Sequence, residues 1–524
     1  MIRCLIAAAP LALCLATAAP GEEPAEQTPA GIYRFALQYP VAALDPQAAQ
    51  SREAGDLVRL AFEGLFEDDP QGRPVPALAA AHEISADGLT WTFTLAPARW
   101  SDGAPVVAGD FVAAFRRLAS PQMASGNGWL IREMAIEAGP AVANGTAPPE
   151  ALGVRALPDG RLELRLARPV PHLRELLSHQ ATFPIPAHVQ TAAAPAAEPP
   201  VVNGPFRPDS VTLERARFLP NPHYRRAGEV RLEAIEAITV NDAEAGLVAW
   251  MDGQIDRVTA PPGLFTQLSE RYPEETRASP LACTYGLMVN LGDGGADILK
   301  NPDIRRALSL ATDRERLVRD IMVSAHRPAY AWTDPMLAGF TAPENPIAAM
   351  AQEERFELAR AILAGLGYHA EAPLRLRLSH NAGDDHRLIA RGIAAMWREA
   401  GIIVSLSSSD WATHEAALRS GEFQIARYGW CADYNAPDPF LAFFGENGPN
   451  YARYDSDAYR AALADLAAGE ADAASRAEAL LIEDLPVIPL YHYARAELVS
   501  ARSRGLPDHN PMQRWNARDI SIQD

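Results

Sequence analysis

An α/β fold is predicted by the sequence, because strands and helices alternate along the C-terminal half of the chain. Residues 374–378 (LRLRL), 402–406 and 423–430 have the apolar patterns of strands, and helical patterns at 386–399 and 411–420 separate them. Strands that alternate with helices of about 10 to 15 residues are typical of βαβ units in a parallel sheet.

The carboxyl ends of these strands mark the expected binding edge. In open α/β sheets, ligands bind outside the carboxyl ends of the strands. The residues found there are 379–385, 407–410 and 430–433. The third group contains Asp433 beside aromatic side chains, so it is a candidate binding segment.

The N-terminal half has shorter elements of mixed type. Residues 57–66 have helical spacing, and residues 89–95 alternate like a half-buried strand. Residues 154–166 predict two strands around a Pro-Asp-Gly turn. A connector rich in Pro and Ala covers 192–200, and the Asn-Gly-Pro turn at 203–205 is expected where the chain crosses between domains.

Composition excludes several classes of partner. The chain has 524 residues, of which 48% are hydrophobic and 22% charged, and its formal net charge is -19. This is an ordinary composition for a globular protein with several domains. Since no basic stripe is present to release counterions from phosphates, we expect neither nucleic acid nor an anionic membrane as a partner.

The first residues have the pattern of a cleaved secretory signal. A positive n-region ends at Arg3, an apolar stretch follows that is shorter than a membrane span, and small residues then offer a cleavage site. We expect a signal peptide over 1–19, a flexible lead over 20–30 and a mature protein in the periplasm. Cys14 leaves a lipoprotein alternative, which the large Leu13 before it disfavours.

Two cysteines, Cys283 and Cys431, remain after removal of the signal peptide. In an exported protein such a pair is a candidate for one disulfide bond. Two separate buried thiols are the alternative.

Reaction signatures are missing from the sequence. It contains no G-x-S-x-G elbow, phosphate loop, C-x-x-C pair or EF-hand spacing, and its 12 histidines do not cluster at metal spacing. Residues 292–297 (GDGGAD) fit either a calcium loop or a surface turn. We expect no enzyme, cofactor or metal, although two carboxylates from distant segments, as in a hydrolase, would leave no trace in the sequence.

Two polar side chains have both a structural and a functional interpretation. Asp433 suits a turn or a helix cap, and beside Trp430, Tyr428 and Tyr434 it also suits an ammonium group. His386 lies in the first turn of a predicted helix, where either a solvated side chain or an anion site is expected.

Several motifs occur along the chain. They are WSDGAPVVAGDF at 100–111, NGP at 203–205, NPHY at 221–224, CTY at 283–285, PDIRRALSLATD at 302–313, RYGWCADYNAP at 427–437 and IPLY at 488–491. Over nearly the whole mature chain they resemble the periplasmic oligopeptide-binding proteins of ABC-type peptide importers. The WSDG and PDIRRAL motifs are similar to a broad solute-binding family, whereas WCADYN points to oligopeptide binding.

The resemblance implies a bilobed α/β fold, the type II periplasmic binding protein, with an additional inserted domain and three domains in all. The inserted domain is expected over 57–184. The first lobe is discontinuous, over 31–56, 185–282 and 493–524, and the second lobe covers 283–492. Both cysteines then lie in the second lobe.

The resemblance also implies the ligand-binding residues. Asp433 matches the position that takes the α-amino group of a peptide, and Arg427 and His386 match positions that meet the terminal carboxylate of peptides of different lengths. Further ligand-binding positions are matched by Trp430, Trp411, Arg419, Cys431 and His179.

The implied function is a monomeric periplasmic receptor that encloses short peptides and delivers them to an inner-membrane ABC permease. Pairing with the peptide main chain gives affinity without reading side chains. Met288 stands where the family has an acidic pocket position, so a preference for Lys-containing peptides is not expected. Met322 stands where the family has a basic position that serves longer peptides, so peptides of about three or four residues are expected. The alternatives are another solute, such as a murein peptide, a dipeptide or an opine-like conjugate, or a role as hydrolase or chaperone.

Overall fold

The computed structural model describes residues 31–41, 43–121, 123, 126–189, 200–446 and 448–523. The predicted signal peptide, the flexible lead and all of the predicted connector except residue 200 lie outside the described residues. No helix among the described residues has the length and apolar character that crossing a membrane requires.

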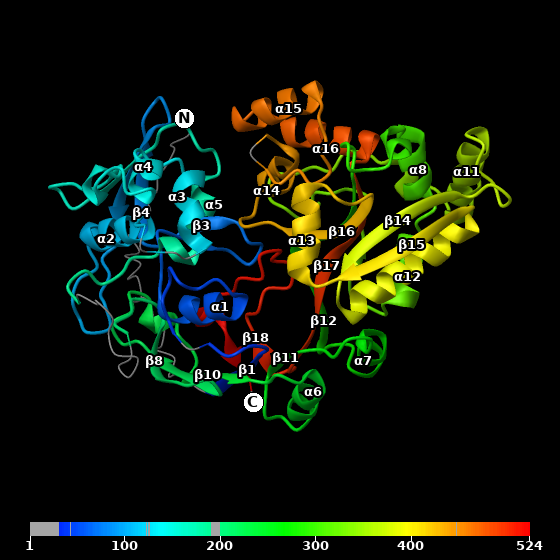
Figure 1. Cartoon of the computed structure of the whole chain (residues 1–524). Helices are drawn as coiled ribbons and strands as arrows, with labels where there is room; N and C mark the ends of the chain where they lie inside the picture. The colour runs from blue at the N-terminus through cyan, green and yellow to red at the C-terminus, as the bar shows by residue number, and fades with distance from the viewer. Residues whose placement is uncertain are drawn as a thin grey trace, which may run out of the picture.

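One 11-stranded sheet extends through both halves of the molecule. Its strand order is β15 (Ile402–Ser409), β14 (Leu374–Asn381), β16 (Ile425–Cys431), β12 (Thr276–Val289), β17 (Val487–Val499), β11 (Arg257–Thr259), β1 (Ile32–Leu37), β10 (Ala234–Thr239), β9 (Arg215–Pro220) and β8 (Phe206–Val211), and β13 (Arg327–Pro328) pairs with β17. Strands β12 and β17, of 14 and 13 residues, pair antiparallel and run from one half to the other. Figure 1 shows them between the blue and cyan half and the yellow and orange half.

The C-terminal half contains the predicted alternation of strands and helices. Strand β14 pairs in parallel with β15 and with β16, and helices α12 (Asp384–Glu399) and α13 (Trp411–Ser420) connect these three strands. The α/β class predicted from this region is therefore confirmed.

The N-terminal half has a separate antiparallel sheet. Its order is β4 (Ala79–Ile84), β5 (Thr90–Leu95), β7 (Leu162–Arg165) and β6 (Val154–Ala156). Strand β5 and the β6–β7 hairpin lie where the sequence predicts strands. Helix α2 (Ala108–Leu118) packs against this sheet, and a two-stranded ribbon, β2 (Phe66–Asp68) with β3 (Pro74–Pro76), lies near it.

The helix predicted over 57–66 is displaced in the structure. Helix α1 (Arg52–Ala61) begins after the capping side chain of Ser51 and ends at Ala61. The N–H of Gly204 donates to the carbonyl of Ala61 over 2.8 Å, and a Cβ on Gly204 would lie 2.5 Å from that backbone, so only glycine fits there. The helix therefore stops where a segment about 140 residues away contacts it, as Asn203 also does by bonding the backbone of Glu63.

The remaining regular elements complete the two halves. They are α3 (Trp129–Glu133), α4 (Gly139–Ala143), α5 (Leu173–Leu177), α6 (Ala243–Met251), α7 (Phe265–Arg271), α8 (Pro302–Leu310), α9 (Arg314–Arg316), α10 (Pro346–Ala349), α11 (Gln352–Gly365), α14 (Asp438–Leu441), α15 (Asp457–Ala467), α16 (Ala473–Asp484), β18 (Ser503–Arg504) and β19 (Ser521–Ile522).

The hydrophobic cores follow the two halves. The largest cluster fills the N-terminal half, and two further clusters lie on opposite faces of β12 and β16. Tyr434 and Ala436 follow β16 in sequence, yet they pack into the core of the N-terminal half. The segment after β16 therefore connects the two halves at the place where Asp433 lies.

Candidate functional site

Strand β16 has one paired and one open edge. Strand β12 pairs with all of β16, whereas β14 reaches only Ile425 and Ala426. The N–H of Ala432 donates to the carbonyl of Ala282 over 2.7 Å, so the even-numbered residues of β16 face β12. The main-chain groups of Gly429 and Cys431 then face the open edge, and no hydrogen bond beyond the ladder reaches them from the described residues. An extended peptide could add to this edge as a further strand.

A disulfide joins the strands beneath this edge. Cys283 and Cys431 are directly opposite each other in the β12–β16 register and are bonded to each other. Of the two interpretations of these cysteines, the disulfide is the one found. Because the sulfur of Cys431 is in the disulfide, only the main-chain N–H and C=O of this residue are free to bind a ligand.

Arg427 lies at the centre of a polar cluster on β16. Its Nε donates to Asn381 Oδ1 over 2.5 Å and its Nη2 to His386 Nε2 over 2.6 Å. The rings of Tyr285 and Trp411 lie 5.4 and 5.7 Å from the guanidinium. The structure thus brings together Arg427, His386 and Trp411, three of the residues to which the resemblance assigns ligand-binding roles.

His386 supports Arg427 as a neutral side chain. An arginine can only donate, so His386 Nε2 is the acceptor in their contact. Burial and the charge of Arg427 lower the pKa of His386 to about 4. Arg427 is therefore the cation of this cluster at neutral pH.

Asn381 and Tyr285 were missed as site residues by the sequence analysis. Asn381 is the last residue of β14 and lies within 379–385, a segment that the strand-end rule had marked. Tyr285 belongs to the CTY motif and stacks on Tyr491 with 5.0 Å between ring centroids. The position of each in a predicted segment or motif was the available signal.

Asp433 follows β16 and has no ion pair or side-chain hydrogen bond with the described residues. Its side chain is exposed, but the protein around it removes enough water to raise the pKa of the carboxyl to about 6, and the nearby charge of Glu133 acts in the same direction. The carbonyl oxygen of Asp433 lies 3.5 Å from Arg514 Nη2. An unpaired carboxylate in such a place is suited to a cationic group of a ligand.

The aromatic residues around Asp433 separate into two sets. Trp430 is half-buried, donates from Nε1 to the carbonyl of Pro439 over 2.7 Å, and packs against Tyr428 and Phe443. Tyr434 instead stacks on His172 of the N-terminal half, with 4.7 Å between ring centroids. Of the three residues expected to form an aromatic wall, Tyr428 and Trp430 pack together at the core on one face of β16, while Tyr434 anchors the segment in the N-terminal half.

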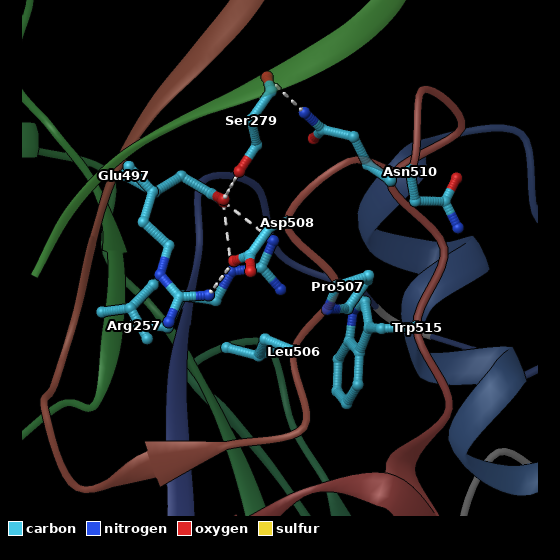
Figure 2. A pocket seen from close by; sticks show the side chains of 11 residues that line it. Arg257, Ser279, Glu497, Leu506, Pro507, Asp508, Asn510 and Trp515 are labelled. Carbon is cyan, nitrogen blue, oxygen red and sulfur yellow. Dashed lines mark hydrogen bonds and ion pairs between the residues drawn. The ribbon is translucent and has the colours of Figure 1, made fainter. Parts of the chain in front are cut away.

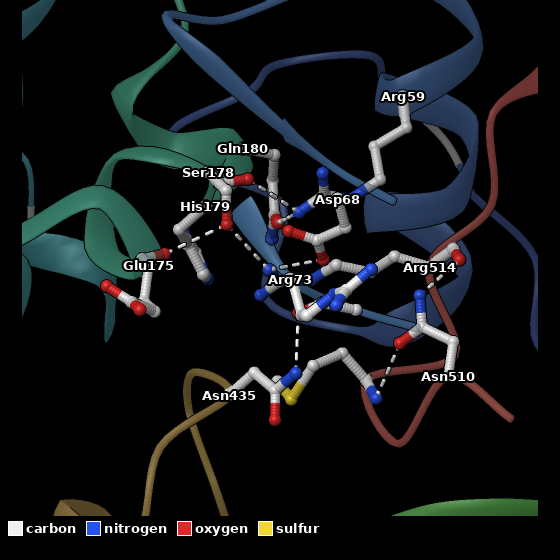
Figure 3. Close-up of polar contacts among 12 residues, drawn as sticks. Arg59, Asp68, Arg73, Glu175, Ser178, His179, Gln180, Asn435, Asn510 and Arg514 are labelled. Atoms are coloured by element: carbon white, nitrogen blue, oxygen red, sulfur yellow. Dashed lines mark hydrogen bonds and ion pairs between the residues drawn. The ribbon is translucent and has the colours of Figure 1, made fainter. Parts of the chain in front are cut away.

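His179 lies in the N-terminal half, in a group of polar side chains that also includes Arg59, Ser178, Gln180 and Arg514 (Figure 3). Its Nδ1 accepts from the N–H of Ala181 over 3.2 Å. Burial and the charges of Arg514 and Arg59 lower the pKa of His179 well below its usual range.

Arg514 links the His179 group to the Asp433 segment. Its Nη1 lies 3.1 Å from Ser178 Oγ and 3.0 Å from Asp68 Oδ2. Arg419, by contrast, lies exposed on the last turn of α13, paired with Glu415 at 2.8 Å. The structure does not bring Arg419 into the Arg427 cluster.

Of the two methionines at expected pocket positions, Met288 is enclosed in the core and Met322 is half-buried. Met288 is 0% exposed. It belongs to the same hydrophobic core as Tyr428 of β16, so it lines no open space. Met322 packs against the core of the C-terminal half.

Other candidate features form closed networks. A hollow at the end of β17 is lined by Arg257, Ser279, Glu497 and Trp515 (Figure 2), where Arg257 and Ser279 both bond the Glu497 carboxylate, at 2.8 and 3.0 Å. In the segment 292–297, Lys300 Nζ lies 3.1 Å from Asp297, as in a surface turn. No group of three or more His, Cys, Asp or Glu residues placed to hold a metal occurs in the described part of the chain.

Comparisons with known proteins place this geometry in a wider group. Residues 73–452 match the family described as bacterial extracellular solute-binding proteins, family 5 middle. The chain is 30% identical to the periplasmic murein peptide-binding protein MppA of Escherichia coli, over 90% of this chain and 89% of that protein. It is 31% identical to the periplasmic oligopeptide-binding protein OppA of Salmonella typhimurium, over 92% of this chain and 91% of that protein.

Solved structures give the same result. The unliganded open form of MppA, a periplasmic murein tripeptide-binding protein, has a TM-score of 0.86 at 28% identity and covers 95% of this chain and 99% of its own. A second structure of the Escherichia coli protein has a TM-score of 0.74 at the same identity and coverage. The arrangement of the two halves described here is thus similar to that open form.

Proposed function

Because this chain belongs to family 5 of the bacterial extracellular solute-binding proteins, we propose that it is a periplasmic receptor that encloses short peptides and delivers them to an inner-membrane ABC permease. The family is one of solute-binding proteins, and we propose no covalent step. We also propose that the chain is exported by a cleaved signal over 1–19 and acts as a monomer.

The observation that carries the proposal is an open strand edge with opposite charges at its two ends. Arg427 lies on β16 and Asp433 just beyond it, and between them the main chain of Gly429 and Cys431 faces the open edge. A peptide that runs antiparallel to β16 would meet Asp433 with its α-ammonium and Arg427 with its carboxylate.

The spacing of the two charges suits a short peptide. Extended chain rises about 3.3 Å per residue, so the six steps from residue 427 to residue 433 span at most about 20 Å. A peptide of three or four residues needs about 10 to 13 Å, which fits within that span. We therefore keep about three to four residues as the proposed ligand length.

We assign the side chains roles in accord with this placement. Arg427 binds the carboxylate, His386 supports it, and Trp411 and Trp430 line the space for ligand side chains. Cys431 contributes its main chain. Arg419 and His179 remain proposed as polar groups at the margins of the site.

We propose that the chain divides as the sequence predicts. An inserted domain over 57–184 and a discontinuous first lobe (31–56, 185–282, 493–524) form the N-terminal half, and 283–492 form the second lobe. The crossing of β12 and β17 and the separate four-stranded sheet support these borders.

Calorimetric titration with free tri-alanine and tetra-alanine tests the function. We expect both to bind with a 1:1 stoichiometry. If no tripeptide or tetrapeptide with a free amine binds, the proposal is wrong.

A murein peptide is the second candidate ligand. Similarity to MppA, both in sequence and in the open structure, favours it. Mass spectrometry of ligand released from purified protein would distinguish the two, since a murein peptide contains diaminopimelate and a γ-linked glutamate. Recovery of ordinary α-linked peptides would count against the murein assignment.

A further inference from the structure

Arg59, on helix α1, is a half-buried cation without a carboxylate partner. Its Nη2 donates to the carbonyl of Ser178 over 3.1 Å and to Gln180 Oε1 over 3.0 Å, and its guanidinium lies 5.5 Å from the ring centroid of Phe183. It forms no ion pair with any residue that the structure describes. Charged side chains are seldom buried unpaired, so this arrangement calls for an explanation.

A structural role of the usual kind does not account for Arg59. Arg314 is also buried without a carboxylate partner, but its three nitrogens all donate, to four main-chain carbonyls and to Ser309 Oγ. Arg59 uses only Nη2. Its Nε and Nη1 donate to no described group and are not shut away from solvent. Arg59 therefore has donor groups that the described protein leaves unused.

The charges around Arg59 leave it as the unneutralised member of its group. Arg514 pairs with Asp68 at 3.0 Å, and Asp56 pairs with Arg52 at 3.2 Å. Burial and the repulsion from Arg514 lower the pKa of Arg59 to about 9, which still leaves it charged at neutral pH. Figure 3 shows Arg59, Arg514 and Asp68 in one group, in which the net charge is positive.

This positive group lies next to the proposed amino-terminal end of the ligand. Ser178 accepts from Arg59 through its carbonyl and contacts Arg514 through its hydroxyl, and Arg514 reaches the carbonyl of Asp433. Two hydrogen-bonded residues thus separate Arg59 from Asp433.

We propose that Arg59 is a receptor for a carboxylate carried by the ligand, so that the preferred substrates are peptides with an acidic side chain at the first or second residue. A guanidinium with open donors suits a carboxylate, which can accept from two nitrogens at once. The proposal deepens the proposed peptide-binding function and rests on it.

The test compares matched peptides that differ only in charge. Affinities of Glu-Ala-Ala against Gln-Ala-Ala, and of Ala-Glu-Ala against Ala-Gln-Ala, are measured by calorimetry at pH 7.5. We expect glutamate to be preferred over glutamine on the order of tenfold at one of the two positions, as charge-assisted hydrogen bonds allow. In Arg59→Met this preference should fall to about one. In Arg161→Met, which removes a partly exposed arginine of the same half that pairs with Asp159, the preference should stay.

Equal affinity for glutamate and glutamine peptides at both positions would overturn the proposal, as would an unchanged preference in Arg59→Met. If Arg59→Met does not fold, the preference of the unmodified protein is measured at low and at high salt. It is also measured in Arg59→Lys, which keeps the positive charge but lacks the paired N–H donors of a guanidinium. A preference that neither change reduces would also overturn it. Binding of the glutamine peptides without any preference would leave the peptide-receptor function standing, whereas failure of every peptide to bind would refute both.

Discussion

Asp433 and Arg427 are two opposite charges without ionic partners among the described residues, one on β16 and one just beyond its carboxyl end. When the two halves enclose a ligand, a charge left without a partner becomes costly, so each charge is most stable when the ligand supplies the opposite one. A zwitterionic peptide does this at both ends. Side-chain identity then matters less than the presence of a free amine and a free carboxylate.

Replacing Asp433 by asparagine removes the receptor for the amine while keeping the size of the side chain. We expect Asp433→Asn to weaken the binding of a free tripeptide by on the order of 2 to 5 kcal/mol, since the ammonium would be enclosed without its partner. Titration calorimetry measures the change. Acetylation of the peptide amine should weaken binding to the unmodified protein by a similar amount, and equal affinity for the acetylated peptide would remove Asp433 from this role.

The same residue makes peptide affinity depend on pH. In the free protein the pKa of Asp433 is raised to about 6, so below that pH the carboxyl is protonated and must lose its proton before an ammonium can pair with it. Affinity should be nearly full at pH 7 and above, half of that at about pH 6, and about tenfold lower at pH 5 than at pH 7. The pKa of His386, about 4, lies below this range. A fall of the same size in Asp433→Asn would contradict the assignment.

Local sequence predicted some contacts of the site and not others. Arg427 and His386 were singled out by the family resemblance, whereas the strand-end rule marked only the neighbouring segment 379–385, which contains Asn381. Arg59 had no such signal, because its partners Ser178 and Gln180 come from a segment about 120 residues away that shows no regular pattern. The stacking of Tyr434 on His172 could not be predicted for a similar reason, because His172 belongs to a distant part of the sequence.

Strand β16 is fixed on one side by β12 and, at its carboxyl end, by the disulfide. Cys283 and Cys431 are 148 residues apart in the sequence, and they lie directly opposite each other in the pairing of β12 with β16. Closing so long a loop restricts the unfolded chain strongly. The edge that we propose pairs with the peptide is thereby held next to Asp433.

Removal of the disulfide should lower the stability of the protein. We expect the double variant Cys283→Ser, Cys431→Ser to lose about 2 to 5 kcal/mol in the free energy of unfolding, mainly because the unfolded chain gains freedom. Urea denaturation followed by tryptophan fluorescence gives the value. Reduced unmodified protein serves as the control and should match the variant. An unchanged unfolding midpoint would show that the bond adds no stability.

The elements predicted well are those whose pattern is local. The strands and helices from β14 to β16 were predicted in type and order, because each buries a face whose period is visible in the sequence. Helix α1 was placed about five residues late, because its end is set by Asn203 and Gly204. The lengths of β12 and β17 were not predicted either, since pairing between the two halves, and not local pattern, extends them.

The two halves are joined by β12 and β17 and by the segment that follows β16. The halves carry different parts of the proposed site: Arg427 and Trp411 on one, His179 and Arg59 on the other. A ligand that contacts both favours a conformation in which they approach, because it binds that conformation better than the open one. The structure is more similar to the unliganded open form of MppA, at a TM-score of 0.86, than to a second MppA structure, at 0.74.

Peptide binding should therefore make the molecule more compact. Small-angle X-ray scattering of the protein with and without saturating tri-alanine should give a smaller radius of gyration for the complex, since hinge closure around a ligand moves whole domains. N-acetylated tri-alanine at the same concentration is the matched control, because it lacks the amine that Asp433 receives. An unchanged radius with a peptide that calorimetry shows to be bound would mean that recognition takes place within one half, and that the groups on the other half, Arg59 included, do not close on the ligand.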